Sequence, residues 1–333
     1  MSNLHWRPVR LCVRRIFKYR PQYVSFAPHV LLRMFQAKAQ SMAYFGLGLL
    51  LSLILSPAIP TSAQNTPCKF DHTAVRFAGS PVEQTRCLLR PNRIGGVLGP
   101  ERKKLPHPLE KLVGQLVVLH KDKLRKYLKK RNVSEGALGG SLDLPLSSAQ
   151  LPRNEYTPAL YFVIHDTSSP YLKDDPFPQY FNTDKNWKGN DLEVWIKQPV
   201  AHIFVNRLGE SLTTTPFNEP VRKGWGTKFA RDLLTAREKG LQLHIELIQP
   251  RRRDPNSSNP KNDRIAPVPG FTKQQYERLA LLYVCASIRR GSWLVPAYHS
   301  AMDAGIKDAH DDPQNFELRE FARALSSLIG KID

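Results

Sequence analysis

The residues best suited to chemistry lie near the C-terminal end of the chain, between residues 298 and 316. This stretch has the sequence YHSAMDAGIKDAHDDPQNF and contains two histidines, four aspartates and one glycine. Imidazole and carboxylate groups are the usual ligands of catalytic zinc, and glycine and proline favour a tight loop that can present them. The pattern indicates a metal site, and an aspartate-rich surface turn is the alternative.

Two distant apolar runs carry further groups of this kind. Residues 161–168 contain His165, and residues 241–247 contain His244 and Glu246. Apolar runs of this length are typical of buried strands. A carboxylate in such a strand needs a partner or a function, so Glu246 is either a general base or one half of a buried ion pair with an arginine of residues 251–253. Taken together, the three stretches indicate a zinc hydrolase.

The segments after residue 150 must position these groups. They alternate between strand-like and helix-like patterns, which predicts an α/β or α+β domain over residues 151–333. Thr272 is a suitable N-cap for the longest helix. Between residues 248 and 271 the chain is rich in Pro, Asn, Arg and Asp, which predicts a long basic loop. Strands are expected at about 159–166, 201–206, 211–214 and 242–248, and helices at about 190–198, 272–290 and 315–329.

Residues 64–150 are expected to form an accessory region. Apolar positions between residues 109 and 131 recur at helical spacing, with lysines on the opposite face. That face is either simply solvated or a contact surface for anionic wall polymers or a membrane. Residues 136–152, rich in Gly, Ser, Leu and Pro, predict a linker. Cys68 and Cys87 could close a small disulfide loop, whereas Cys285 lies in a helical apolar pattern and is expected to be a buried thiol.

The N-terminus, residues 1–63, has the pattern of a signal peptide behind an extended basic arm. It contains eight Lys or Arg and no acidic residue, so it supplies part of the net charge of +20. Its apolar core, residues 44–55, is short for a membrane span and is followed by small residues, which predicts cleavage after Ala63. An uncleaved anchor and a later start at Met34 or Met42 are the alternatives. We therefore expect a periplasmic or secreted protein.

Residues 156–328 resemble the zinc-dependent N-acetylmuramoyl-L-alanine amidases. This family includes the phage lysozyme-type amidases and the peptidoglycan recognition proteins. Five pieces in the family's order carry the resemblance, whereas residues 64–150 lie outside it. The pieces are VIHDTS (163–168), AHIFVNRLG (201–209), HIEL (244–247), YHS (298–300) and DPQNF (312–316).

The resemblance implies a mixed central β-sheet flanked by helices. It implies a Zn²⁺ ion bound by His165, His299 and Asp312, a catalytic Glu246 and a structural His202. The activity it implies is hydrolysis of the amide between N-acetylmuramic acid and L-alanine, with peptidoglycan or muropeptides as substrate. A non-catalytic peptidoglycan-binding protein is the alternative within the same family.

One departure from the family pattern concerns the third ligand. Bacterial members of the family usually place this ligand nearer to the second histidine, with a lysine two residues before it; here His310 occupies the lysine's place. His310 or Asp311 is therefore an alternative third ligand, and a protonated His310 is a candidate to stabilise the oxyanion. The extra residues, 303–308, are expected to bulge outward, with Asp303 and Asp308 as caps or as supports of a zinc-bound histidine.

Two other functional classes are disfavoured. The basic composition alone would suit a nucleic-acid binder, but no helix-turn-helix, zinc-finger spacing or aromatic-interleaved basic strand accompanies it, so no nucleic acid is expected. A metalloprotease of the common type is disfavoured because the chain contains no His-Glu-x-x-His motif.

Overall fold

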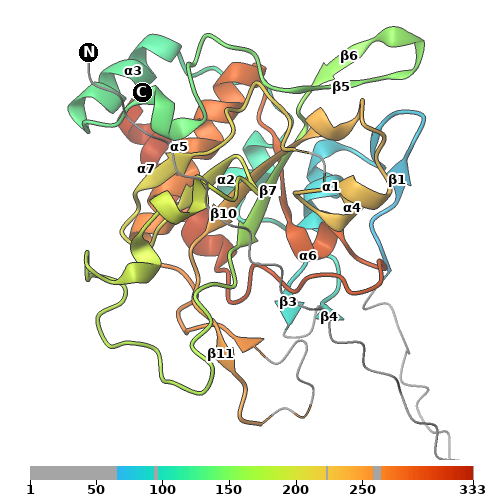
Figure 1. Cartoon of the computed structure of the whole chain (residues 1–333). Coiled ribbons are helices and arrows are strands. Elements are labelled where there is room, and N and C mark those ends of the chain that lie inside the picture. Colours follow the sequence, from blue (N-terminus) through green and yellow to red (C-terminus); the bar gives the residue numbers. More distant parts are fainter. Residues whose placement is uncertain (1–65, 94–96, 223, 257, 259–263, 333) are drawn as a thin grey trace, which may run out of the picture. The chain divides into compact units, whose positions relative to one another are not determined.

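The structure is a computed structural model that describes residues 66–332 apart from 94–96, 223, 257 and 259–263 (Figure 1). All of these residues belong to the compact unit Ala58–Asp333. The expected signal peptide, residues 1–63, and its cleavage site after Ala63 lie outside the described residues. Within the described part of the chain, no helix is both long and apolar enough to cross a bilayer.

A five-stranded mixed sheet lies at the centre, with strand order β13-β7-β10-β8-β9. The first four strands are parallel to their neighbours, and β9 is antiparallel to β8. β7 and β10 are apolar runs buried almost throughout, as expected for strands covered on both faces. The bounds are β7 Tyr161–Asp166, β8 Ile203–Val205, β9 Ser211–Thr213, β10 Gln242–Leu247 and β13 Val295–Tyr298.

The four strands that the sequence predicts are confirmed, and β13 is an additional one. β13 has four residues, one of which is Pro296, and proline is rare inside strands because it cannot donate a ladder hydrogen bond. It is tolerated here because β13 is the edge strand of the sheet. The sequence pattern therefore gave no signal for the strand that leads to His299.

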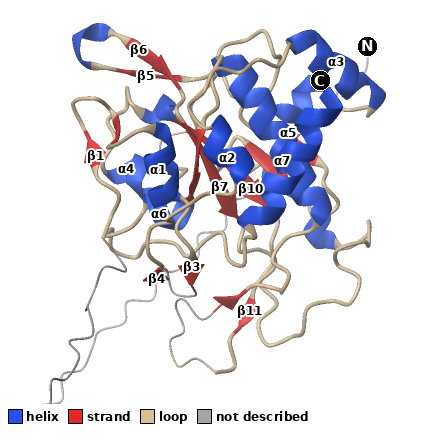
Figure 2. Cartoon of the chain, turned by 180° about the vertical axis from the view of Figure 1, so that it is seen from behind, coloured by secondary structure: helices blue, strands red, loops and turns tan. Residues whose placement is uncertain are grey.

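Helices cover both faces of the sheet (Figures 1 and 2). α5 and α7 pack against each other on one side of it, and α1, α4 and α6 lie on the other side. This arrangement confirms the predicted mixed sheet flanked by helices. The bounds are α1 Pro81–Leu88, α2 His107–Leu112, α3 Lys121–Lys130, α4 Lys228–Asp232, α5 Lys273–Arg290, α6 His299–Met302 and α7 Leu318–Ile332.

α5 forms as the sequence predicts. The side chain of Thr272 accepts the N–H of Gln275, and the side chain of Gln275 accepts the N–H of Thr272, so the helix begins with a capping box. It ends at Gly291, whose φ of 83° is in the left-handed region that favours glycine. Cys285 is fully buried within α5, as expected.

Residues 66–150 share the core of the rest of the chain. Cys68 and Cys87 form the expected disulfide, and the hydroxyl of the buried Tyr161 on β7 accepts the N–H of Phe77 and donates to Gln84. One hydrophobic cluster includes residues on both sides of residue 150. Short strand pairs complete this region: β1 Phe70–Asp71 with β2 Arg76–Phe77, and β3 Asn92–Arg93 with β4 Val97–Leu98.

Three local expectations were wrong. The helix expected over 109–131 is two helices, α2 and α3, because the segment between them pairs with residues 291–293 and contains Gly114, whose φ is 78°. The linker expected at 136–152 contains β5, Ser148–Gln150, which pairs with β6, Tyr156–Pro158. The carbonyls of Gly139, Leu144 and Pro145 in the same segment accept hydrogen bonds from Arg289. The helix expected at 190–198 is only two 3₁₀ turns, Lys188–Asn190 and Glu193–Trp195.

The remaining elements are β11 Arg252–Arg253, β12 Arg264–Ile265, and the 3₁₀ turns Glu135–Leu138, Pro152–Asn154 and Lys239–Leu241.

Candidate metal centre

The predicted ligands and the candidate base meet at the carboxyl ends of the parallel strands. β13, β7 and β10 run parallel, and their register places Glu246 opposite His165. His299 directly follows β13 as the first residue of α6. Asp312 lies on the loop after α6, and its carbonyl accepts the N–H of Ser300 at 2.9 Å. Parallel strands that end together therefore gather groups from distant parts of the sequence.

His165, His299 and Asp312 form a buried group that could hold a metal ion. One ligand atom from each lies within 4.8 Å of the others. The two histidine Nδ1 atoms are 3.0 Å apart, His299 Nδ1 is 2.9 Å from Asp312 Oδ1, and His165 Nδ1 is 3.7 Å from Asp312 Oδ2. Ligand atoms around a tetrahedral zinc ion are about 3.3 Å apart, given metal–ligand distances near 2.0–2.1 Å. The observed separations therefore fit one tetrahedral ion.

The second nitrogen of each histidine has its own partner. His299 Nε2 lies 2.8 Å from Asp303 Oδ2, and His165 Nε2 lies 3.0 Å from His244 Nδ1. With the Nε2 atoms engaged in these contacts, both Nδ1 atoms lie on the side of Asp312. Metal-bound histidines almost always donate their other N–H in this way, which fixes the tautomer and the ring orientation.

The carboxylates make the centre favourable for positive charge. Burial opposes protonation of His299, but Asp312 and Asp303 outweigh burial and hold the pKa of His299 well above its usual range. Burial alone would raise the pKa of Asp312, yet the facing His299 lowers it below the usual value. The carboxylates that raise the pKa of His299 favour positive charge at this place, and a bound cation would supply that charge.

Asp303 supports His299, as expected, and is itself held by a helix. Its carboxylate accepts the backbone N–H groups of Lys228 at 3.1 Å and Phe229 at 2.8 Å, the first two residues of α4. Asp303 is fully buried, so the extra residues of this loop do not all bulge outward. Asp308, in contrast, is exposed and has a φ of 55°.

Glu246 lies beside the ligands with an unused acceptor atom. Its Oε1 is 3.8 Å from His165 Nδ1, and its side chain is 13% exposed. Its Oε2 is buried and has no hydrogen-bond partner among the described residues. Burial, followed by the charge of Asp312, raises the pKa of Glu246 well above its usual range. A carboxylate in this environment accepts a proton readily, as a general base must.

The ion-pair alternative for Glu246 is wrong. Arg251 donates to Asp166 at 2.6 Å, and Arg253 contacts Asp174 at 3.3 Å. Arg252 makes no ion pair with an acidic group within the described part of the chain and faces the Phe177 ring. The three arginines are therefore directed elsewhere, and the general-base alternative remains for Glu246.

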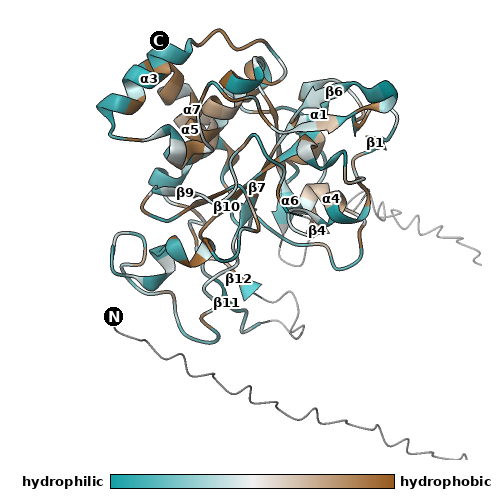
Figure 3. Cartoon of the chain, turned by 45° about the horizontal axis from the view of Figure 1, so that its top comes forward, coloured by the Kyte–Doolittle hydropathy of each residue, from teal (hydrophilic) through white to brown (hydrophobic). Residues whose placement is uncertain are grey.

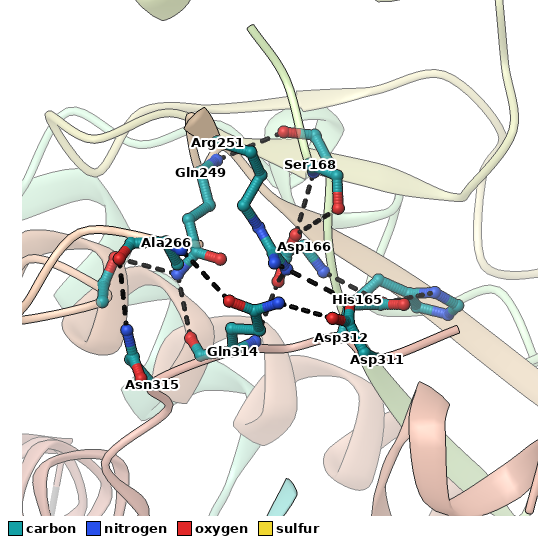
Figure 4. A network of polar contacts seen from close by, with 12 residues as sticks. His165, Asp166, Ser168, Gln249, Arg251, Ala266, Asp311, Asp312, Gln314 and Asn315 are labelled. Carbon is teal, nitrogen blue, oxygen red and sulfur yellow. Dashed lines mark hydrogen bonds and ion pairs between the residues drawn. The ribbon is translucent and has the colours of Figure 1, made fainter. Parts of the chain in front are cut away.

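The two alternative third ligands lie outside the ligand group. The His310 side chain is 58% exposed, and its Nδ1 is 3.7 Å from Asp312 Oδ1. Its ring packs against that of His299, so it stands at the rim of the site. Asp311 accepts a hydrogen bond from the Gln314 side chain at 2.5 Å (Figure 4). Asp312 is thus the residue of this segment that faces both histidines.

Two buried histidines on or near β10 have supporting positions. His202 Nδ1 accepts the N–H of His244 at 2.9 Å and its Nε2 donates to the Glu219 carbonyl at 3.0 Å, so both nitrogens are used within the fold. His244, which supports His165, was not assigned a role from the sequence. The signal was its position two residues before Glu246, because residues i and i+2 of a strand share a face.

Two hollows flank the chain where it leaves β7. One has a volume of about 390 Å³ and includes Ser168, Arg264, His310 and Asp312 in its lining. The other has a volume of about 300 Å³ and is lined by residues that include Ser169, Trp187 and Trp195. The first hollow therefore reaches Asp312, a member of the group that could hold a metal ion.

No protein-family model matches this chain, and no curated protein or solved structure matches it. The resemblance to the amidases therefore rests on the ordered motifs of the sequence. The convergence of His165, His299, Asp312 and Glu246 is a separate observation, made from the geometry of the fold.

Proposed function

We propose that the chain is a zinc-dependent N-acetylmuramoyl-L-alanine amidase that hydrolyses the amide between N-acetylmuramic acid and L-alanine in peptidoglycan or muropeptides. The observation that carries this proposal is the convergence of His165, His299 and Asp312 with Glu246, whose buried Oε2 has no hydrogen-bond partner among the described residues. Two imidazoles and one carboxylate are typical of catalytic zinc, because they leave a fourth tetrahedral position open. The ordered amidase motifs supply the substrate class.

Each residue then has a defined task. When bound, zinc supplies Lewis acidity and lowers the pKa of a coordinated water. Glu246 accepts the proton of the attacking water and passes it to the departing alanine nitrogen, so that a C–O bond forms as the C–N bond breaks. His310, at the rim of the hollow, donates to the developing oxyanion when it is protonated. Asp303 and His244 hold the two histidine rings in orientation.

The alternative is a peptidoglycan-binding protein without turnover. Such a protein has no need of Glu246, because burying its Oε2 without a hydrogen-bond partner among the described residues costs free energy. The complete set of His165, His299, Asp312 and Glu246 therefore favours the enzyme. The disulfide Cys68–Cys87 supports a periplasmic or secreted location, where disulfides persist and peptidoglycan is present.

Digestion of purified peptidoglycan tests the proposal. We expect the protein to release stem peptides with free L-alanine amino termini, identified by mass spectrometry, and to create no new reducing sugar ends. A chelator should abolish the release and added zinc should restore it. New reducing ends would identify a glycosidase instead, and binding without any cleavage product would favour the recognition protein.

The lysines of α3 support a second proposal, a surface for an anionic wall polymer. Lys126, Lys130 and Arg131 line a hollow of about 610 Å³ together with Lys331 of α7. Within the described chain, none of these four makes an ion pair with an acidic residue, whereas Lys121 and Arg125 on the same helix are paired with acids. Figure 3 shows α3, largely hydrophilic, next to the C-terminus. A concave basic surface fits a polyanionic strand better than a flat membrane.

Replacing Lys126 and Lys130 with Gln should weaken binding to a poly(glycerol phosphate) chain about 30-fold at low salt, at roughly 1 kcal/mol per lysine. The matched control is Lys185→Gln with Lys197→Gln, two exposed residues far from α3 in the sequence. Cleavage of soluble muropeptides should be unchanged in both variants. Equal losses in the two variants would mean a general charge effect, and loss of binding only to anionic vesicles would mean a membrane surface.

A further inference from the structure

A buried ion pair lies directly behind the candidate metal centre. Arg251 Nη2 donates to Asp166 Oδ2 at 2.6 Å, and the two side chains are 1% and 0% exposed. Burying two charges costs several kcal/mol per ion, so such a pair is weak evidence for stability by itself. Its contacts with the segments that carry His165 and Asp312 indicate another role.

Asp166 connects the two ligand-bearing segments. It directly follows His165 on β7, and its backbone N–H donates to Asp312 Oδ2 at 3.2 Å. Its side chain accepts the backbone N–H of Gln314 at 2.9 Å, two residues after the ligand. The other carboxylate oxygen accepts from Ser168. One residue therefore fixes the distance between the end of β7 and the loop that presents Asp312.

Arg251, on the loop after β10, holds Asp166 in its position between β7 and the loop that carries Asp312 (Figure 4). Its Nη1 donates to the Arg264 carbonyl at 3.1 Å, and its backbone N–H donates to the Pro170 carbonyl at 3.0 Å. The Gln314 side chain donates to the same Arg264 carbonyl at 2.9 Å. The guanidinium is thus held in one place, where its charge compensates Asp166 and allows that carboxylate to stay close to the carboxylate of Asp312.

We propose that Arg251 and Asp166 are positioning residues that set Asp312 in place for metal binding before any ion arrives. The inference rests on the proposed function, in that His165, His299 and Asp312 must be the ligands. Neither Arg251 nor Asp166 belongs to the ligand group itself. Preorganisation lowers the cost of ordering the ligand loop when the ion binds.

The direction of the effect separates positioning from simple electrostatics. Replacing Arg251 with Met removes a positive charge close to a cation site, so Coulomb attraction alone predicts tighter metal binding. Loss of positioning predicts the opposite. Without the guanidinium, the buried carboxylates of Asp166 and Asp312 repel each other, and the loop that carries Asp312 is no longer held against β7.

The experiment is a zinc titration of the whole chain against a fluorescent chelator of known affinity. Arg251→Met should bind zinc about 10- to 100-fold more weakly than the wild type, the usual effect of losing a partner behind a ligand. Arg253→Met is the matched control, because it removes the same charge two residues away, where the ion pair with Asp174 is exposed. It should bind zinc as the wild type does. Equal or tighter zinc binding by folded Arg251→Met would overturn the inference.

A second variant covers the case in which Arg251→Met does not fold. Asp166→Asn keeps the size of the side chain, but one carboxylate oxygen of Asp166 accepts the backbone N–H of Ser168 and the other accepts that of Gln314. In either orientation the amide of Asn therefore turns its NH₂ group toward a donor, where an acceptor is required. It should also weaken zinc binding about 10-fold or more. A wild-type affinity in this variant would contradict the inference. If the wild type binds no zinc, the proposed function fails; if the wild type binds and cleaves while both variants keep its affinity, only the positioning role fails.

Discussion

Replacing His299 with Ala should release the metal and abolish hydrolysis together. His299 is the most constrained ligand, because its Nδ1 faces Asp312 and His165 while its Nε2 is held by Asp303. Removing it leaves one imidazole and one carboxylate, which is one ligand fewer than catalytic zinc sites use. The loss of zinc affinity should exceed roughly 100-fold, the upper end of the effect of removing a residue that only hydrogen-bonds to a ligand. Elemental analysis of the purified variant and the peptidoglycan digest measure the two effects.

The variant also needs a test of its fold. Asp303 and Asp312 lose a partner in the alanine variant, so its stability should fall as well. His299→Gln provides the second measurement, because its amide can still donate to Asp303 while it supplies no imidazole. His107→Ala, at an exposed position on α2, is the control for surface histidines. A folded His299→Gln protein with stoichiometric zinc and full activity would show that the centre has been misassigned.

His310 and Asp312 provide a related contrast. Asp312→Ala should lose zinc, since Asp312 faces both histidines, whereas His310→Ala should keep zinc and lose rate, since His310 stands at the exposed rim. The reverse result would make His310 the third ligand. The two variants therefore distinguish the ligand from the oxyanion partner within one short segment.

The central part of the fold could be predicted because its strands have a strong local pattern. β7 and β10 are apolar runs that must be buried, and the single polar groups within them, His165 and Glu246, stand out for that reason. β13 could not be predicted, because it is short, contains Pro296 and forms by pairing with β7. Between α2 and α3 the chain pairs with residues 291–293, a long-range contact that periodicity cannot show.

The ligands could be predicted from motifs, but their supports could not. Asp303 is held by N–H groups of α4, about 75 residues earlier in the chain, and nothing in the sequence links the two segments. The ion pair of Asp166 and Arg251 could not be predicted either, because the sequence pattern suggested Glu246 as the partner of Arg251. Long-range pairings of this kind follow from the strand order, which becomes visible only in three dimensions.

Replacing Glu246 with Gln should reduce the rate of hydrolysis by about 10²–10⁴ while zinc stays bound, because the amide keeps the shape of the side chain but cannot accept the proton of the attacking water. Glu246 is not a member of the ligand group, so metal content should remain close to one ion per chain. Single-turnover cleavage of a muropeptide at saturating zinc isolates the chemical step from changes in binding.

The stability of the metal-free variant provides the matching control. The folded state raises the pKa of Glu246, through burial and then through Asp312, so wild-type stability falls as the pH rises from the unfolded pKa near 4.5 through the raised value. Glutamine has no proton to lose, so the zinc-free Glu246→Gln protein should be at least as stable as the zinc-free wild type, with a difference that grows as the pH rises. Thermal unfolding in a chelator at pH 5 and pH 8 measures this. A variant that is more stable than the wild type but inactive would show that Glu246 serves the reaction at a cost to the stability of the fold. A destabilised variant with nearly normal turnover would mean that Glu246 serves the structure and that another group is the base.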